Sequence, residues 1–241
     1  MTLFTRIKYL KNGLIENMKT TKEILWAEVF NSTINGSKWF KESISPGRWA
    51  VGYPFLYVLY RILDEVKPEN ILELGLGQSS KMTCSYAVHN KDRNILHRIV
   101  EHDEEWKDFF IGSNEALFKE ENSEIVIMPL ENTNYEEVQV TRYEKFVDKL
   151  PEVKWNLILV DAPFGSDEFS RIDVLDLIPK NLSDRFVILI DDCERGGELN
   201  TCEKIKEKLS ANNIVWHEGI YSGEKEVRII VSNNLKFLCT L

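Results

Sequence analysis

Cysteine is scarce in this sequence, and none of the four cysteines is spaced as C-x-x-C. A disulfide framework or a zinc site is therefore not indicated, and a reducing cytoplasm is the expected location. No stretch approaches the ~20 consecutive apolar residues that a membrane-spanning helix needs. Residues 1–15 also lack a long apolar core, so a signal peptide is not expected.

Positive charge is in deficit as well, because 30 Lys and Arg stand against 39 Asp and Glu, a formal net charge of −9. This balance argues against a broad basic face that binds nucleic acid, so no nucleic-acid partner is expected. What is present is the composition of a folded protein, with 43% hydrophobic and 29% charged residues. The 241 residues suffice for one large domain, or for one domain with an extension.

The first part of the chain differs from the rest by its mixture of polar and aromatic residues. Its helical spacing is interrupted at residues 31–33 and 35–37, so one or two short helices are expected. The Ser45-Pro46-Gly47 turn then separates an N-terminal helical extension, residues 1–47, from a main domain, residues 48–241. The extension is interpreted as an arm packed on the core, with a lid, a substrate-recognition segment or a dimer contact as alternatives.

Residues 70–88 have the pattern of a strand, a tight glycine turn and a helix. An apolar run at residues 70–74 stops at Gly75-Leu76-Gly77, and helical spacing follows from Ser80. In an open α/β sheet such a turn lies at the carboxyl end of a strand, where ligands bind. The glycines allow a sharp turn with a ligand directly on the backbone, and Ser79 or Ser80 can cap the helix.

Within this strand Glu73 is an acid among apolar residues, which is costly unless the carboxylate has partners. The order Glu73-x-Gly75-x-Gly77 resembles the first motif of the class I S-adenosylmethionine-dependent methyltransferases. The resemblance implies that the glycine loop cradles the methionine part of the cofactor, and that Glu73 orders the loop and reaches the cofactor's amino group. An ordinary strand, turn and helix of another nucleotide-binding protein is the alternative. The candidate cofactor loop comprises Glu73, Gly75, Gly77, Gln78, Ser79 and Ser80.

A second carboxylate is expected at the same edge of the sheet. Residues 94–101 alternate into a strand that ends at Glu101, 26 residues after Gly75. A carboxylate there suits both hydroxyls of a ribose, because it offers two acceptors side by side, and the resemblance implies the same role. Asp103 is the nearby competitor, but acids 103–105 are interpreted as the solvated start of a helix.

The strand predicted at residues 155–160 is continuously apolar, as is typical of a buried parallel strand, and it ends at Asp161. Asp161 matches the fourth motif of the methyltransferase family, whose strand-end acid lies beside the transferred methyl group. It is therefore a candidate for both cofactor binding and catalysis, with a plain turn cap as the alternative. The run Asp161-Ala162-Pro163-Phe164-Gly165 is also similar to glucuronoxylan O-methyltransferases, which favours a saccharide acceptor.

The next buried strand, residues 186–190, ends in Asp191 and Asp192, which repel each other unless a positive charge lies near. With Asp161 on the neighbouring strand they offer three oxygen ligands, a set that suits Mg²⁺ or Mn²⁺. The arrangement resembles that of catechol O-methyltransferase-like enzymes, although Asp192 stands where their pattern has an asparagine. Alternatively, Asp191 or Asp192 caps the following helix and binds no metal. Arg171 either pairs with an acid or binds an anionic group of a substrate.

The remaining pattern completes an α/β architecture. Residues 213–221 and 226–231 flank a glycine turn and predict a hairpin, whereas residues 131–154 look irregular, with a helix near 143–150. We therefore expect a doubly wound, mostly parallel seven-stranded sheet with an antiparallel C-terminal hairpin, the Rossmann-like fold of class I methyltransferases. Further helices are predicted at residues 54–63, 80–88, 106–118, 171–178 and 198–209, and a further strand at residues 123–130.

The resemblance implies methyl transfer from S-adenosylmethionine to an oxygen of a small molecule or saccharide. A metal held by the three aspartates would lower the pKa of the acceptor hydroxyl and orient it, which makes Asp161 and Asp191 the candidate catalytic residues. Without a metal, Asp161 is the preferred base. The alternatives are another S-adenosyl-nucleoside enzyme, such as an aminopropyl transferase, and a non-catalytic cofactor-binding protein. The identity of the acceptor and the formation of a homo-oligomer stay open.

Overall fold

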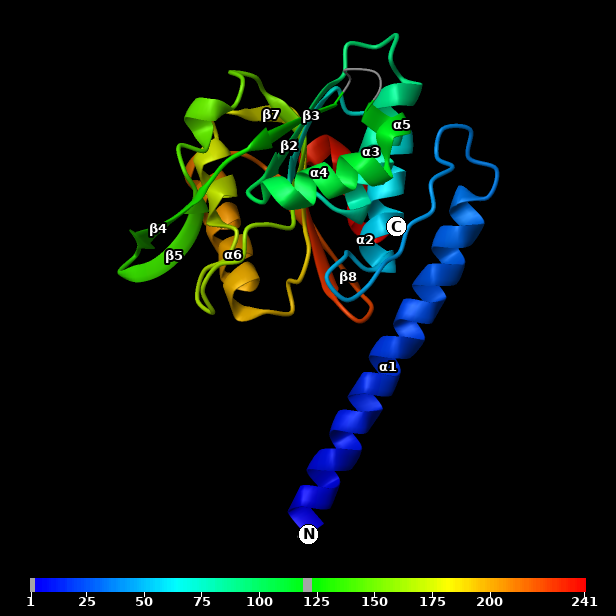
Figure 1. Cartoon of the computed structure of the whole chain (residues 1–241). Helices are drawn as coiled ribbons and strands as arrows, with labels where there is room; N and C mark the ends of the chain where they lie inside the picture. Colours follow the sequence, from blue (N-terminus) through cyan, green and yellow to red (C-terminus); the bar gives the residue numbers. More distant parts are fainter. Residues whose placement is uncertain (1–2, 119–122) are drawn as a thin grey trace.

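A seven-stranded sheet forms the centre of the protein in a computed structural model that describes residues 3–118 and 123–241 (Figure 1). β9 runs antiparallel to both of its neighbours, β7 and β8, and the other adjacent pairs are parallel. The predicted mostly parallel sheet with a C-terminal antiparallel hairpin is thus confirmed. The strands are β1 (Asn70–Leu74), β2 (Leu96–Glu101), β3 (Ser123–Ile127), β6 (Trp155–Val160), β7 (Leu182–Ile190), β8 (Trp216–Ser222) and β9 (Glu226–Ser232), in the order β3-β2-β1-β6-β7-β9-β8.

The order of the strands reverses between β1 and β6, which lie side by side in the middle of the sheet. From β1 the chain adds β2 and β3 on one side, and from β6 it adds the remaining strands on the other. Such a reversal leaves a crevice outside the carboxyl ends of the two central strands. Leu74 is paired with Val160, so β1 and β6 end at the same level. Gly75 and Asp161, the residues that follow them, therefore share one edge.

Helices cover both faces of the sheet (Figure 1). Along β1, Ile71 packs in the apolar cluster that contains α2, whereas Leu72 and Leu74 pack in the cluster that contains α6. Because both faces are buried, β6 and β7 have continuous apolar sequences. The helical elements are α1 (Leu3–Ile34), α2 (Tyr53–Arg61), η1 (Ile62–Val66), α3 (Gln78–His89), α4 (Glu104–Ser113), α5 (Glu115–Phe118), η2 (Val147–Lys149), η3 (Ile172–Leu177), α6 (Gly196–Ala211) and η4 (Asn233–Thr240).

The N-terminal segment is a single long helix, α1, rather than one or two short ones, and it projects beyond the sheet (Figure 1). The break predicted at residues 31–33 is wrong, because these polar side chains remain compatible with the helix; Thr33 Oγ1, for example, donates to the carbonyl of Val29 at 2.7 Å. The helix ends before Gly36, whose φ of +89° suits glycine. Among the described residues, no helix combines the length and apolar character needed to cross a bilayer.

Residues 131–154 are more regular than predicted. β4 (Leu130–Tyr135) and β5 (Val138–Tyr143) form an antiparallel hairpin outside the main sheet. Its turn holds Glu136 and Glu137 at φ of 47° and 70°, so it lacks the glycine or asparagine that normally marks such a turn in a sequence. Two helix predictions are corrected as well: the helix near 143–150 is only the short 3-10 turn η2, and residues 171–178 contain the 3-10 helix η3.

Candidate active site

A cavity of about 660 Å³ opens at the carboxyl ends of β1, β2 and β6. Gly75 and Gly77 after β1, Glu101 at the end of β2 and Asp161 after β6 all line it. The sequence singled these residues out from separate stretches of the chain. They meet because parallel strands that end at one edge of a sheet bring their following loops together.

The two glycines of the loop have different surroundings. Gly75 has a φ of +101°, and a Cβ added to it would lie 2.9 Å from the Cβ of Ala162. Gly77 has an extended backbone, its N–H donates to Ser80 Oγ at 3.0 Å, and an added Cβ would meet open space. The packing of the loop against Ala162 therefore requires a glycine at position 75. At Gly77, in contrast, no side chain occupies the space beside the backbone.

Glu73 lies behind this loop and does not line the cavity. Its buried carboxylate accepts hydrogen bonds from Ser79 Oγ at 2.5 Å and Thr83 Oγ1 at 2.9 Å, and His97 Nε2 lies 3.6 Å from Oε2. Glu73 thereby ties the first two turns of α3 to β1, which orders the glycine loop. Thr83 and His97 were not predicted. The spacing of Thr83, four residues after Ser79 on the same helix face, is the signal that could have identified it.

The carboxylate of Glu101 is almost fully buried and is held by backbone donors. Oε1 accepts from the N–H groups of His102 at 2.6 Å and Asp103 at 2.9 Å, and Oε2 accepts from Leu76 N–H at 3.1 Å. Oε2 keeps a second acceptor position for a ligand. Asp103 caps α4 by accepting from Trp106 N–H at 2.9 Å, in line with its interpretation as part of a helix start.

Trp106 is a cavity residue that the sequence analysis missed. Its indole Nε1 donates to the carbonyl of Leu76 at 2.7 Å, and its ring stacks on Phe109 with centroids 5.6 Å apart. Gln78, at the start of α3, closes the loop from another direction, because its Oε1 accepts from Ser45 N–H at 3.1 Å. The glycine loop is therefore fixed to α4 on one side and to the segment before α2 on the other.

Three acids gather where β6 and β7 end. Oxygen atoms of Asp161, Asp191 and Asp192 all lie within 4.8 Å of one another. Burial raises the pKa of Asp161 to about 6. Burial, together with the charge of Asp161, raises the pKa of Asp191 to about 8. Burial by itself would raise the pKa of Asp192, but the cations Arg171 and Lys225 outweigh this effect and hold the pKa below its ordinary value.

Arg171 is a buried cation within this group of acids. Its Nη2 donates to Asp192 Oδ2 at 2.6 Å and lies 3.2 Å from Asp161 Oδ1, and its Nη1 donates to the carbonyl of Asp191 at 2.8 Å. Burial alone would lower the pKa of Arg171, but the neighbouring acids raise it. Of the two roles that the sequence left open for Arg171, the geometry supports pairing with acids.

Lys225, in the turn between β8 and β9, is a second cation in the group. Its Nζ lies 3.0 Å from Asp191 Oδ2 and 3.0 Å from Asp192 Oδ1. Arg195 adds a half-exposed guanidinium at 3.1 Å from Asp192 Oδ2. Lys225 was not predicted, although the adjacent acids had indicated that some positive charge must lie near. Neither Asp191 nor Asp192 caps the following helix through its side chain, since Arg195 precedes α6.

Two exposed aromatic residues lie at the mouth of the cavity. Trp49 and Phe164 have 84% and 58% of their surface exposed, and their rings meet edge to face with centroids 5.8 Å apart. Both line the cavity, one from the segment before α2 and the other from the loop after Asp161. Large exposed aromatic rings at a cavity mouth provide apolar surface for a ligand.

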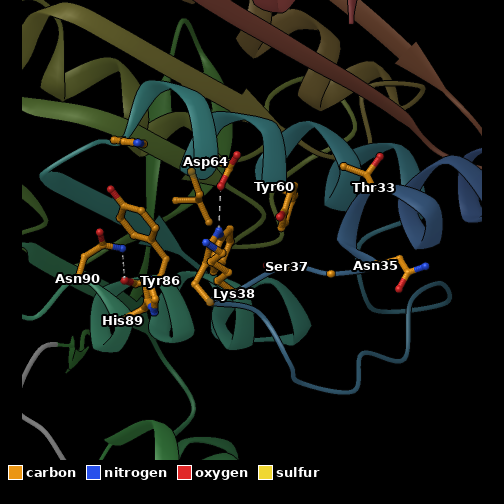
Figure 2. Close-up of a pocket in the computed structure, with 13 residues that line it drawn as sticks. Thr33, Asn35, Ser37, Lys38, Tyr60, Asp64, Tyr86, His89 and Asn90 are labelled. Atoms are coloured by element: carbon orange, nitrogen blue, oxygen red, sulfur yellow. Dashed lines mark hydrogen bonds between the residues drawn. The ribbon is translucent and has the colours of Figure 1, made fainter.

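A second cavity, of about 410 Å³, lies between the end of α1, the following loop, α2 and α3 (Figure 2). Trp39 Nε1 donates to Asp64 Oδ1 at 3.0 Å, and the Trp39 ring stacks on Tyr60 with centroids 4.9 Å apart. The described residues that line this cavity include none of the predicted site residues. The candidate active site is therefore the cavity at the strand ends.

No protein-family model matches the chain, and no curated protein matches it. The SAH-bound methyltransferase PaMTH1 from Podospora anserina aligns with it over 88% of both chains, at 13% identity and a TM-score of 0.53. The O-methyltransferase from Bacillus cereus in complex with SAH aligns over 93% of this chain and 96% of that chain, at 13% identity and a TM-score of 0.50. The chain thus has the fold of class I S-adenosylmethionine-dependent methyltransferases, as its motifs had indicated.

Proposed function

We propose that this protein is an S-adenosylmethionine-dependent methyltransferase that acts on a hydroxyl group of a small molecule or saccharide. The observation that carries the proposal is that the glycine loop, Glu101 and Asp161 line one cavity at the reversal point of the sheet. Each of these features was predicted separately for the cofactor. Their convergence on one crevice is what cofactor binding on this fold requires.

In this proposal the cofactor lies against the backbone at Gly77, where no side chain occupies the space. The free acceptor position on Glu101 Oε2 receives a ribose hydroxyl, because the backbone donors already hold that carboxylate in place. The ring of Trp106, whose Nε1 donates to the carbonyl of Leu76, also lines the cavity and offers a flat apolar face. Glu73, Ser79 and Ser80 act from behind the loop, by fixing its shape, rather than from the cavity wall.

S-adenosylmethionine supplies, when bound, an activated methyl group: the acceptor oxygen bonds to the methyl carbon while the electron pair of the broken carbon–sulfur bond stays on sulfur. Asp161 takes the hydroxyl proton in this proposal. It lines the cavity, its side chain is 23% exposed, and Arg171 contacts only one of its oxygens among the ion pairs of this site. Asp191 is fully buried and does not line the cavity, so its contribution is to position Lys225.

The acceptor class is proposed from the mouth of the cavity. The exposed Trp49 and Phe164 rings can pack against the apolar face of a sugar ring or against another flat molecule. A saccharide is favoured because the Asp161–Gly165 run is similar to glucuronoxylan O-methyltransferases. The segment before α2 supplies Trp49, so the start of the main domain contributes to acceptor recognition.

Isothermal titration with S-adenosylhomocysteine tests the cofactor step. We expect one site per chain, and no binding of either S-adenosylmethionine or its demethylated product would defeat the proposal. Transfer of radiolabelled methyl groups to a panel of saccharides and phenols tests the reaction. Normal cofactor affinity with no turnover on any acceptor would instead support a non-catalytic cofactor-binding protein.

An aminopropyl transferase is the other alternative, and the acid group does not favour it. Such an enzyme needs carboxylates that are free to hold a polyamine cation. Here Asp191 and Asp192 are already paired with Lys225, and Asp161 with Arg171. The protein should therefore form no product when it is incubated with decarboxylated S-adenosylmethionine and a polyamine.

The proposal also includes self-association of the protein and its location in the cell. Leu14, Met18, Ile24 and Leu25 each expose more than half of their surface along α1, and an exposed apolar row of this kind favours packing against a second copy of the chain. Light scattering coupled to size-exclusion chromatography would measure the mass, and a strictly monomeric protein would refute this part.

The cysteines are free, which fits the cytoplasmic location that we expect.

A further inference from the structure

The three aspartates that resemble a metal site have cations in the places where a metal ion would bind them. A divalent ion needs carboxylate oxygens directed at one point. Lys225 Nζ lies 3.0 Å from oxygens of both Asp191 and Asp192. The guanidinium of Arg171 contacts the remaining oxygen of Asp192 and one oxygen of Asp161. A second cation placed among these acids would lie beside an ammonium and a guanidinium, so the donor set does not fit Mg²⁺ or Mn²⁺.

The turn that carries Lys225 is anchored, so its position is a built feature of the fold. Glu23 of α1 accepts from Glu224 N–H at 2.9 Å with one oxygen and from Tyr53 N–H at 2.7 Å with the other. A Cβ on Gly223 would lie 1.9 Å from Glu23, so the turn passes directly against that side chain. On the other side, Glu226 N–H donates to Glu194 Oε2 at 2.8 Å. The turn is thereby held between α1 and the loop after β7.

Lys225 also lines the cavity, together with Asp161, Arg171 and Asp192. An ammonium has three N–H donors. Lys225 donates to Asp191 Oδ2 at 3.0 Å, and Asp192 Oδ1 lies 3.0 Å from Nζ as an ion-pair contact. A further N–H is available to an oxygen in the cavity. A cation beside the acceptor oxygen would orient the acceptor and favour its deprotonated form. A metal ion has the same two effects in a metal-dependent transferase.

We propose that the Lys225 ammonium takes the place of a divalent metal ion and binds the acceptor oxygen beside Asp161. This inference rests on the proposed function, because it concerns the acceptor side of the same site. Asp191 and Asp192 are then the residues that hold the ammonium, and the enzyme needs no divalent ion. The carboxylates that resemble a metal-binding pattern hold a lysine instead.

Mn²⁺ titration of the chain saturated with S-adenosylhomocysteine tests the proposal without knowledge of the acceptor. Electron paramagnetic resonance of free Mn²⁺ gives the amount bound. We expect no stoichiometric binding to the natural chain or to Lys225→Arg, which keeps a cation. Lys225→Met removes the cation and should bind Mn²⁺ roughly tenfold more tightly than the natural chain. Lys204→Met, in which a surface lysine paired with Glu136 is lost, is the matched control and should behave like the natural chain.

Two outcomes would overturn the proposal. One is stoichiometric Mn²⁺ binding by the natural chain, and the other is an unchanged Mn²⁺ affinity in Lys225→Met. Retained affinity for S-adenosylhomocysteine shows that each variant is folded, and Asp191→Asn in the Lys225→Met background should abolish the gained Mn²⁺ binding. If the natural chain fails to bind S-adenosylhomocysteine, the proposed function fails, and that result is separate from the Mn²⁺ result.

Discussion

The two glycines of the loop look equivalent in the sequence, yet the structure predicts that replacing Gly75 lowers stability whereas replacing Gly77 lowers ligand affinity. In Gly75→Ala the new side chain must adopt a φ of +101° and meet the Cβ of Ala162 at 2.9 Å. A non-glycine residue in such a conformation costs about 1–3 kcal/mol, and the close contact adds to this. Taking about 2 kcal/mol, a chain of this size should lose roughly 4–8 °C in Tm.

Gly77→Ala should leave the fold nearly intact, because its backbone is extended and the added Cβ meets open space. Loss of glycine from the position before α3 costs less than about 1 kcal/mol. That open space is where the proposed cofactor lies, so the affinity for S-adenosylhomocysteine should fall about tenfold or more, which corresponds to at least about 1.4 kcal/mol.

Differential scanning fluorimetry gives Tm, and isothermal titration gives the affinity, for both variants side by side. The expected pattern is a lowered Tm in Gly75→Ala and a weakened ligand in Gly77→Ala with near-normal Tm. Gly77→Ala with the natural affinity would refute the placement of the cofactor across this loop. Gly75→Ala with the natural Tm would refute the packing of the loop against Ala162.

Three further predictions concern carboxylates. Glu101→Gln sets an amide N–H₂ against backbone donors, at a cost of about 1–3 kcal/mol, and should weaken S-adenosylhomocysteine binding in isothermal titration. The methyl-transfer rate should fall as pH drops through about 6, because protonated Asp161 cannot accept a proton, and Asp161→Asn should remove this dependence. Glu73→Gln should lose about 1–3 kcal/mol in urea unfolding, whereas Glu69→Gln, at an exposed side chain just before β1, should not; equal stability of the two would contradict the role of Glu73.

The edge of the sheet could be predicted because its signals are local. Apolar runs that stop at Gly75, Glu101, Asp161 and Asp191 mark the carboxyl ends of strands. Because the strands are parallel and joined by right-handed crossovers, the topology of the sheet brings these ends together. The surroundings of Gly75 and Gly77 could not be predicted in the same way, because they depend on what the neighbouring loop places against each Cα.

The parts that were wrong or missed depend on contacts between distant segments. The β4–β5 hairpin has no turn residue that marks it, and its pairing decides that residues 138–143 form a strand. Glu73 found its partners Thr83 and His97 only when α3 and β2 packed around it. A sequence pattern indicates that a buried acid needs a partner, but the partner is chosen by packing.

The sequence by itself determined the alternation of strands and helices and the acids at the strand ends, since periodicity and strand-end residues are encoded within short stretches. The tertiary structure alone decided which cations lie beside the acids. Lys225 lies 34 residues after Asp191 along the chain, and only the antiparallel return of β9 beside β7 brings its ammonium between Asp191 and Asp192. Three carboxylates at the ends of neighbouring strands predict a metal site, but the sequence does not show that the fold places a lysine among them, because charge compensation depends on distance in space and not on distance along the chain.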